Sequence, residues 1–290
     1  MRCRRLPPML AVALAACGGS APSVAPEPRA LGPDRFLQVP PRPPGVPGGA
    51  DLGRQLDSLD LAGREERVFL EVARGNVPSW LRRLVPVELA GRVAGRERRV
   101  VFWVTPDYLA VGADADYLLQ PLSPQAAQRI ADLVAASLPT PAMVDAIWAA
   151  ARVRLDPAPI PPSPRMTTEA VFVDHNEMVA AARRRSPEPL GALVAGDKKD
   201  VVLVPALAES PGRVAIYGWH RLTGDPIQPV YLGHTDRWVD YSHGIRLVSR
   251  RMLVDGAERD LREVLRDPDL APLLTRGGPI AAPAYPVRPD

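Results

Sequence analysis

The chain contains little cysteine, little lysine and no long apolar run. Only 2 of its 290 residues are cysteine, and both, Cys3 and Cys17, stand near the amino terminus. No apolar stretch reaches the roughly 18 residues that a membrane-spanning helix needs. Phosphate-binding and dinucleotide-binding motifs are also missing, as are Gly-x-Ser-x-Gly, His-Glu-x-x-His and Ser-x-x-Lys. These absences argue against a nucleotide-dependent enzyme.

The first residues have the features of a secretory signal. Arginines at positions 2, 4 and 5 precede a short apolar stretch and then small residues. The sequence Leu14-Ala15-Ala16-Cys17 resembles the lipobox of bacterial lipoproteins. This resemblance implies a signal peptide over 1–16 and a diacylglycerol thioether on Cys17, which becomes the first mature residue. Gly18 in place of Asp would favour the outer membrane in a Gram-negative host; the alternative is an ordinary signal peptide with a chance cysteine.

Lipidation of Cys17 would leave the folded part without a thiol, because Cys3 departs with the leader. That excludes a disulfide framework, a cysteine nucleophile and a zinc site with sulfur ligands. The formal charge of +3 also changes. The leader carries three of the 36 basic side chains, so the mature chain balances its 33 acidic ones. We therefore expect no nucleic-acid partner, which would need clustered basic residues.

Proline divides the chain into regions. The 35 prolines are well above the usual share of about 5%. Many fall in residues 17–50, which predicts a disordered, lipidated Pro/Gly-rich tether. An α+β globular domain is expected over 51–275 and a C-terminal tail over 276–290. Five prolines between 156 and 165 mark a stiff loop or a domain boundary.

Periodicity and punctuation predict the secondary structure of the domain. Ser123-Pro124 and Thr140-Pro141 each supply an N-cap and an N1 proline. Helices are expected over 64–74, 123–138, 140–153, 178–185 and 258–266. Strands are expected over 85–93, 98–104, 171–173, 201–204, 214–217, 230–232 and 245–248. Because strands and helices do not alternate strictly, we predict an α+β fold with a mixed, mainly antiparallel sheet and flanking helices.

One segment, residues 217–243, concentrates chemically useful side chains. It holds three of the four histidines and five of the fifteen aromatic residues. Histidine transfers protons near neutral pH and ligates metals, and a neighbouring aspartate orients its ring. Aromatic faces with polar tips suit glycan or peptide ligands. The alternative is a buried meander in which these side chains are core, and a divalent metal stays open because no spacing matches a ligand signature.

The two lysines form a second candidate. Lys198 and Lys199 are the only lysines beside 34 arginines, and Asn76 and Asn176 the only asparagines. Arginine replaces lysine where only charge matters, whereas lysine can shift its pKa. Both Lys198-Lys199 and His175-Asn176 are expected in loops beside strands, where sites often lie. The alternative is a solvated turn of low energetic value.

A third clue is a resemblance over about thirty residues. Ser242-His243-Gly244-Ile245-Arg246-Leu247 resembles the Ser-His-Gly-Cys-Ile-Arg-Leu signature of YkuD-type L,D-transpeptidases, which cross-link peptidoglycan. Residues 216–220 loosely resemble that family's earlier strand-borne histidine. The nucleophilic cysteine would fall between Gly244 and Ile245 and is missing, so thiolate transpeptidation is excluded. Residues 77–248 also resemble a widespread set of secreted bacterial proteins of undescribed function, from which no activity carries over.

Two functions from different classes follow. The first is an envelope-anchored hydrolase acting on peptidoglycan or another extracytoplasmic polymer. Its catalytic candidates are His220, His234, His243, Asp240, Lys198 and Lys199. Its substrate-binding candidates are Tyr217, Trp219, Tyr241, Arg246, His175 and Asn176. The second is a non-catalytic lipoprotein that binds cell-wall glycan or a periplasmic partner through the aromatic-rich segment 217–243.

Overall fold

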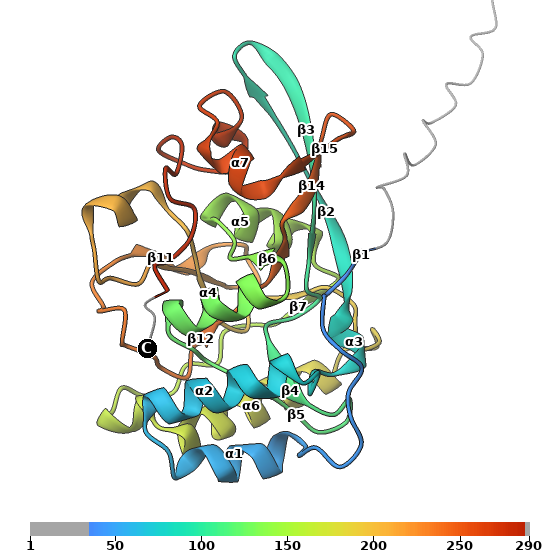
Figure 1. Ribbon diagram of the computed structural model, residues 1–290, viewed down its shortest axis with the longest axis vertical. Helices are drawn as coiled ribbons and strands as arrows, with labels where there is room; N and C mark the ends of the chain where they lie inside the picture. Colours follow the sequence, from blue (N-terminus) through green and yellow to red (C-terminus); the bar gives the residue numbers. More distant parts are fainter. Residues whose placement is uncertain (1–34, 288–290) are drawn as a thin grey trace, which may run out of the picture. The chain divides into compact units, whose positions relative to one another are not determined.

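A computed structural model describes residues 35–287 (Figure 1). Its helices are α1 (Gly49–Asp57), α2 (Leu61–Ala73), α3 (Ser79–Arg82), α4 (Pro124–Leu133), α5 (Pro141–Ala150), α6 (Glu169–Arg184) and α7 (Leu261–Arg266), with 3₁₀ turns at Pro164–Thr167, Pro205–Glu209 and Ala271–Leu273. Its strands are β1 (Arg35–Phe36), β2 (Arg83–Val93), β3 (Arg96–Val104), β4 (Ala110–Gly112), β5 (Tyr117–Leu119), β6 (Ala136–Ser137), β7 (Val153–Arg154), β8 (Val194–Ala195), β9 (Lys199–Val201), β10 (Ile216–His220), β11 (Pro226–Tyr231), β12 (His243–Gly244), β13 (Val248–Ser249), β14 (Arg251–Val254) and β15 (Ala257–Asp260).

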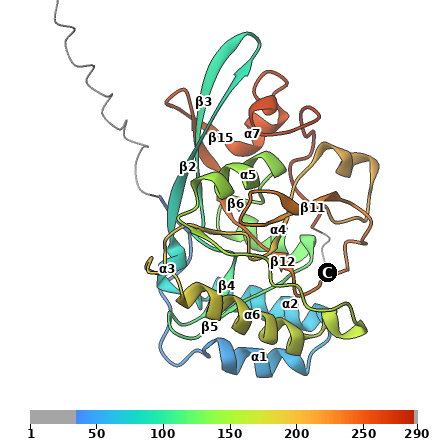
Figure 2. The ribbon, with the colours of Figure 1, turned by 180° about the vertical axis from the view of Figure 1, so that it is seen from behind.

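The fold is α+β, as the sequence predicts. A seven-stranded sheet runs in the order β1-β2-β3-β13-β6, with β14 also pairing with β3 and with β15. A four-stranded sheet runs β11-β10-β9-β12. Most pairs are antiparallel, and β12–β9 is a parallel one. Helices α1, α2 and α6 lie together at one end, and the β2–β3 hairpin extends from the other (Figures 1 and 2).

The predicted helix starts at Ser123-Pro124 and Thr140-Pro141 are confirmed, but the predicted ends of both helices are wrong. Ser123 and Thr140 cap α4 and α5 and accept from Ala126 N and Met143 N. Both helices end three to five residues early because the next residues pair as strands: β6 with β13, and β7 with β8. Sheet pairing far along the chain therefore outweighs the local helical pattern.

Several other segments differ from the prediction. Of the strands expected over 201–204 and 245–248, only Val201 and Val248 are strand, and the helix expected over 178–185 is the second half of α6. The expected strand 171–173 is part of α6, where the buried positions recur with helical spacing: Val171, Phe172, His175, Asn176, Val179 and Arg183. The expected helix 258–266 begins only at Leu261. The residues before it form β15, and Asp260 caps α7 by accepting from Arg262 N at 2.8 Å.

The folded body extends further at both ends than expected. Arg35–Phe36 pairs with β2, and Leu37 lies in the core. The linker prediction is therefore wrong for residues 35–50. In the expected tail, Ile280 and Tyr285 are buried, and the Tyr285 hydroxyl donates to Val202 O at 2.8 Å. The described residues belong to one compact unit without a division near 156–165.

The absence of a side chain at Gly244 allows β12 to pack closely against Tyr108 and Lys198 where it pairs with β9. A Cβ atom there would lie 2.5 Å from Tyr108 ring carbons and 2.9 Å from the Lys198 Cβ. We predict that Gly244→Ala destabilises the fold by about 1–3 kcal/mol, because the neighbouring ring and strand must move. Equilibrium urea unfolding measures the change. Gly91→Ala is the control, since its Cβ would meet Leu273 at an ordinary 3.4 Å, and an equal loss in both variants would contradict the argument.

Candidate functional site

The four-stranded sheet brings three candidate segments together. Lys199 on β9 lies opposite Gly218 on β10 and opposite His243 on β12. Residues separated by more than forty positions thus become neighbours on adjacent strands. The candidate centre consists of His243, Asp240, Lys198, Lys199, His234 and His175.

His243 is completely buried and has no hydrogen-bond partner at either ring nitrogen within the described structure. Burial lowers its pKa to about 4; the Asp240 carboxylate opposes this, while the charges of Lys199, His234 and Lys198 lower it further. The imidazole is therefore neutral at pH 7 and has a lone pair available. A buried polar group without a partner is rare in proteins and is often a functional group.

Asp240 lies three residues before His243 and is also buried. Burial raises its pKa, but His243, Lys199 and the Ser242 hydrogen bonds outweigh this and lower the pKa to about 2. Ser242 donates to it through its backbone N at 2.8 Å and through its hydroxyl. Trp238 donates through Nε1 at 3.2 Å. Asp240 is therefore a fixed negative charge beside the neutral imidazole.

Lys198 is buried in the interior, so the solvated-turn alternative is wrong. Its Nζ donates to Tyr241 O at 2.7 Å and lies 3.2 Å from His175 Nδ1. Burial lowers the Lys198 pKa to about 8, against the opposing charges of Asp197 and Asp240. Burial and the Lys198 charge lower the pKa of His175 to about 2, so neutral His175 accepts the hydrogen bond.

Aromatic side chains enclose this centre. His175 contacts the rings of Tyr241 and Trp219, with centroids 4.8 and 6.4 Å away. The Trp219 Nε1 donates to Asp197 O at 3.0 Å, and the Tyr241 hydroxyl bonds to the backbone of Ile160. Trp219 has φ of +55°, which is strained for a bulky residue and holds its ring under Lys199 Nζ, 5.1 Å from the centroid.

His234 lies at the more open side of the centre. It is half-buried, stacks on Trp238 at 4.9 Å and meets the edge of Tyr231 at 5.2 Å. Burial lowers its pKa, with Asp240 opposing and Lys199 adding to the shift. The aromatic residues of segment 217–243 therefore divide into a buried set, Tyr217, Trp219 and Tyr241, and a more exposed set, Tyr231 and Trp238.

His220 and Tyr217 belong to a different cluster. Tyr217 donates its hydroxyl to Asp145 Oδ1 at 2.7 Å, and His220 Nε2 lies 3.2 Å from the same atom. Arg276 pairs with Asp145 Oδ2 at 2.6 Å, and the His220 ring stacks on Trp148. His220 is thus held in a different cluster from His234 and His243. In the described part of the chain, no three His, Cys, Asp or Glu side chains are placed to hold a metal.

Asn176 and Arg246 have structural contacts. Asn176 lies on α6, not in a loop, and its amide bonds to Leu119 N at 2.9 Å and Tyr117 O at 3.1 Å, which ties the helix to β5. Arg246 is buried, donates to Thr105 O and Val194 O, and stacks on Tyr108 at 4.0 Å.

Three buried carboxylates were missed from the sequence: Asp107, Asp197 and Asp200. Neither Asp197 oxygen has a hydrogen-bond partner in the described residues, and Tyr108 donates to Asp200 at 2.8 Å. Burial raises the pKa of Asp107 to about 7 and that of Asp200 to about 6. Asp197 and Asp200 flank the lysine pair in the sequence, which was an available signal. Asp107 gives no such signal.

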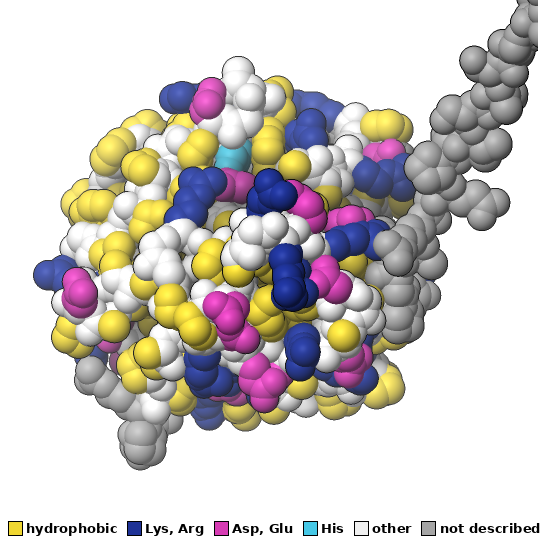
Figure 3. Space-filling model, turned by 90° about the horizontal axis from the view of Figure 1, so that it is seen from above, with side chains coloured by type: hydrophobic (Ala, Val, Ile, Leu, Met, Phe, Trp, Pro, Cys, Tyr) yellow, Lys and Arg dark blue, Asp and Glu magenta, His cyan; other side chains and the backbone are white. Residues whose placement is uncertain are grey.

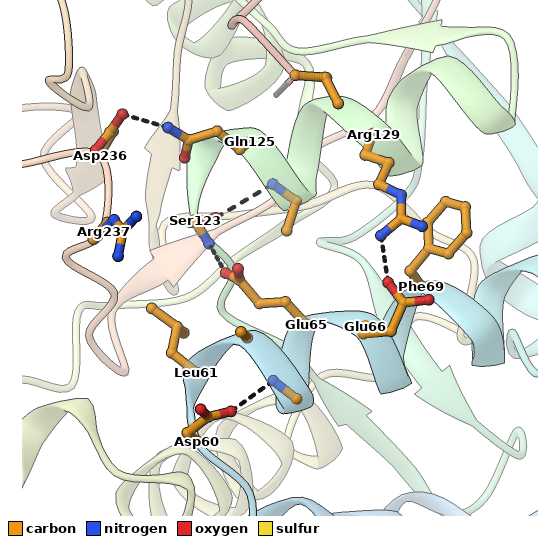
Figure 4. Close-up of a pocket in the computed structure, with 14 residues that line it drawn as sticks. Asp60, Leu61, Glu65, Glu66, Phe69, Ser123, Gln125, Arg129, Asp236 and Arg237 are labelled. Atoms are coloured by element: carbon orange, nitrogen blue, oxygen red, sulfur yellow. Dashed lines mark hydrogen bonds and ion pairs between the residues drawn. The ribbon is translucent and has the colours of Figure 1, made fainter. Parts of the chain in front are cut away.

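A groove of about 960 Å³ lies between α2, α4 and the loop that follows His234 (Figure 4). It is bordered by the first turns of α2, by the start of α4 and by Asp236 and Arg237, which follow His234 in the chain. On the face shown in Figure 3, basic and acidic side chains are interspersed without a continuous basic area.

Comparison with models of known families, with curated proteins and with solved structures finds no match to this chain. The resemblances to the lipobox and to the L,D-transpeptidase signature therefore stay predictions.

Protonation of His243 should destabilise the fold. In the unfolded chain the pKa of this histidine is 6.5, whereas in the folded protein it is about 4. Between these two pH values the unfolded chain binds a proton and the folded protein does not. The stabilisation that His243 contributes is therefore lost as the pH falls from 7 toward 4. The loss is about 2 kcal/mol between pH 7 and pH 5. The raised pKa values of Asp107 and Asp200 make the folded protein more stable as the pH falls, which opposes the effect of His243. To isolate the contribution of His243, urea unfolding of His243→Gln is compared with that of the wild type.

We expect the free energy of unfolding of His243→Gln to rise relative to that of the wild type by about 2 kcal/mol when the pH is lowered from 7 to 5. His234→Gln, at a half-buried position, should show a smaller relative gain. Parallel pH profiles for wild type and His243→Gln would contradict the assignment.

Proposed function

We propose that the protein is a lipid-anchored extracytoplasmic hydrolase whose general base is His243. The observation that supports this most is the buried, neutral imidazole with both nitrogens unpartnered, beside an ionised aspartate and two lysines. A group held in this way costs stability, which natural structures tolerate chiefly where the group has a task.

The residues suggest a division of roles. His243 would take a proton from a water molecule while the water oxygen attacks the substrate, and would then return the proton to the leaving group. Asp240 would stabilise the imidazolium formed between these steps. The Lys198 ammonium, or that of Lys199, would stabilise negative charge that develops on the substrate, as a fixed cation does in a site poor in water. Lys199 is half-buried, and its charge is near enough to lower the pKa of His234.

The substrate class follows from the resemblance and from the location it implies. An L,D-transpeptidase-like signature without its cysteine has no thiolate to form an acyl-enzyme, so water is the natural nucleophile and hydrolysis the natural outcome. We therefore propose peptidoglycan, or another polymer of the cell envelope, as substrate. The proposed anchor, Cys17, lies outside the described residues. Within residues 35–287, no helix is long and apolar enough to cross a membrane.

An exposed aromatic surface supports the second candidate function, binding of cell-wall glycan without catalysis. Tyr231 is 42% exposed and forms a layered surface with His234 and Trp238, and Val230 beside it is also exposed. Stacked aromatic residues at a surface suit the apolar face of a sugar ring. A non-catalytic lipoprotein that binds cell-wall glycan would use this surface and leave the polymer intact.

Purified peptidoglycan sacculi distinguish the two functions. We expect the wild-type protein to release soluble fragments and His243→Gln to lose at least about 100-fold in rate, the usual contribution of a general base. His220→Gln is the matched control and should retain activity, because its ring pairs with Asp145. Reactions with and without EDTA show whether a divalent metal is required.

Full release of fragments by His243→Gln would remove this residue from the mechanism. If wild type releases none but sediments with sacculi, and Trp238→Ala does not, the binding function is the correct one.

The anchor is tested separately. Cys17→Ser removes the thiol that the lipobox resemblance assigns to diacylglycerol. We expect the variant to lose labelling by radioactive palmitate and to leave the membrane fraction, because each buried methylene contributes about 0.8 kcal/mol to anchoring. Ser20→Ala is the control. Equal labelling of both variants would show that Cys17 is not the site of lipid attachment.

A further inference from the structure

The groove of Figure 4 shares a loop with the candidate centre. Trp238 donates to Asp240 at one end of this loop, and Gln125 on α4 donates to Asp236 at the other. The loop is also held by the bond from Asp236 N to Gly212 O at 2.9 Å. A ligand seated in the groove would therefore lie against the chain segment that leads directly to Asp240 and His243.

Most charges in the groove are already matched. Asp60 caps α2 and accepts from Gly63 N at 2.8 Å, and Glu65 accepts from Ser123 N at 2.6 Å. Glu66 pairs with Arg129, whose guanidinium covers the Phe69 ring at 3.7 Å. These carboxylates are satisfied by helix amino termini or by arginine, so they leave little need for a ligand cation.

Asp236 and Arg237 are different. The only described partner of the Asp236 side chain is the neutral amide of Gln125, so its charge is not cancelled there. Arg237 is exposed, and among the described residues its guanidinium has no hydrogen-bond or ion-pair partner. Adjacent residues thus present one negative and one positive group toward the same groove, and Leu61, Phe69 and Val287 supply apolar lining.

We propose that this groove binds a short peptide bearing both a free ammonium and a free carboxylate, the first at Asp236 and the second at Arg237. The inference rests on the proposed function, since the groove would then hold the peptide part of the envelope polymer next to the hydrolytic centre. Two opposite charges a residue apart match a zwitterion better than an ion of one sign. The guanidinium fork is well suited to a carboxylate, and the apolar lining suits small aliphatic side chains.

The test measures binding in the inactive His243→Gln background, so its outcome does not depend on hydrolysis. The probe is the dipeptide alanyl-alanine, titrated into the full chain in detergent and followed by calorimetry. Two modified probes, N-acetylated and C-amidated, each lack one charge. We expect each modification to weaken binding at least about 10-fold, in line with losing one charge-assisted hydrogen bond.

Protein variants assign each charge to its residue. Arg237→Gln should bind alanyl-alanine at least about 10-fold more weakly and no longer distinguish the free acid from the amide. Asp236→Asn should no longer distinguish the free amine from the acetylated probe. Arg221→Gln replaces an exposed arginine outside the groove and should bind as the parent does.

Equal affinity of the three probes for the parent protein, or unchanged discrimination in both variants, overturns the inference. In that case, loss of sacculus hydrolysis in His243→Gln would leave the proposed function standing. Conversely, binding with the expected discrimination in a protein that never cleaves sacculi would reject the hydrolase and retain the peptide site.

Discussion

The parallel contact of β12 with β9 joins the two chain segments that carry His243 and the lysine pair of the centre. It has only two residues on β12, and the bare Cα of Gly244 allows the strand to approach Tyr108 and Lys198. That approach puts His243 beside Lys199 and leaves Lys198 on the inner side, where Tyr241 and His175 receive its hydrogen bonds. Because His243, Asp240 and Lys198 are buried, each charge acts strongly on the others.

The resulting electrostatics are consistent with one another. Asp240 remains ionised because imidazole, ammonium and Ser242 donors surround it, while His243 and His175 are neutral because burial and the lysines disfavour a second positive charge. Under the proposed function, this cluster would supply a neutral base, an anion and a cation near pH 7. The same burial costs the fold stability, because polar groups without partners lose their hydration there.

Much of the fold could be predicted from local signals. The caps at Ser123 and Thr140, the β2–β3 hairpin and the α+β class follow from neighbouring residues and short periods. The errors occur where a distant partner decides. Residues 171–173 are β-branched or aromatic, but their buried spacing continues through His175 and Val179, so they form a helix. Arg35–Phe36 looks like linker until β2 is available to pair with it.

The site follows the same rule. The rarity of lysine pointed to Lys198, yet nothing local indicated that its partner would be His175 on a helix 23 residues away. Three histidines close in sequence were expected to act together, but strand β10 carries His220 to Asp145 while β12 carries His243 to Lys199. Sequence proximity identified the segment; strand pairing determined the neighbours.

The last described segment carries two residues, Arg276 and Tyr285, that contact parts of the chain made much earlier. Tyr285 inserts its hydroxyl between Ala215 N and Val202 O, bridging the backbone just after β9 and just before β10, and Arg276 holds Asp145 at the His220 cluster. A chain made from its amino terminus has all its histidines and lysines long before it has this closure. The hydrogen bonds that Tyr285 makes across the ends of β9 and β10 can therefore form only after all four histidines and both lysines have been synthesised.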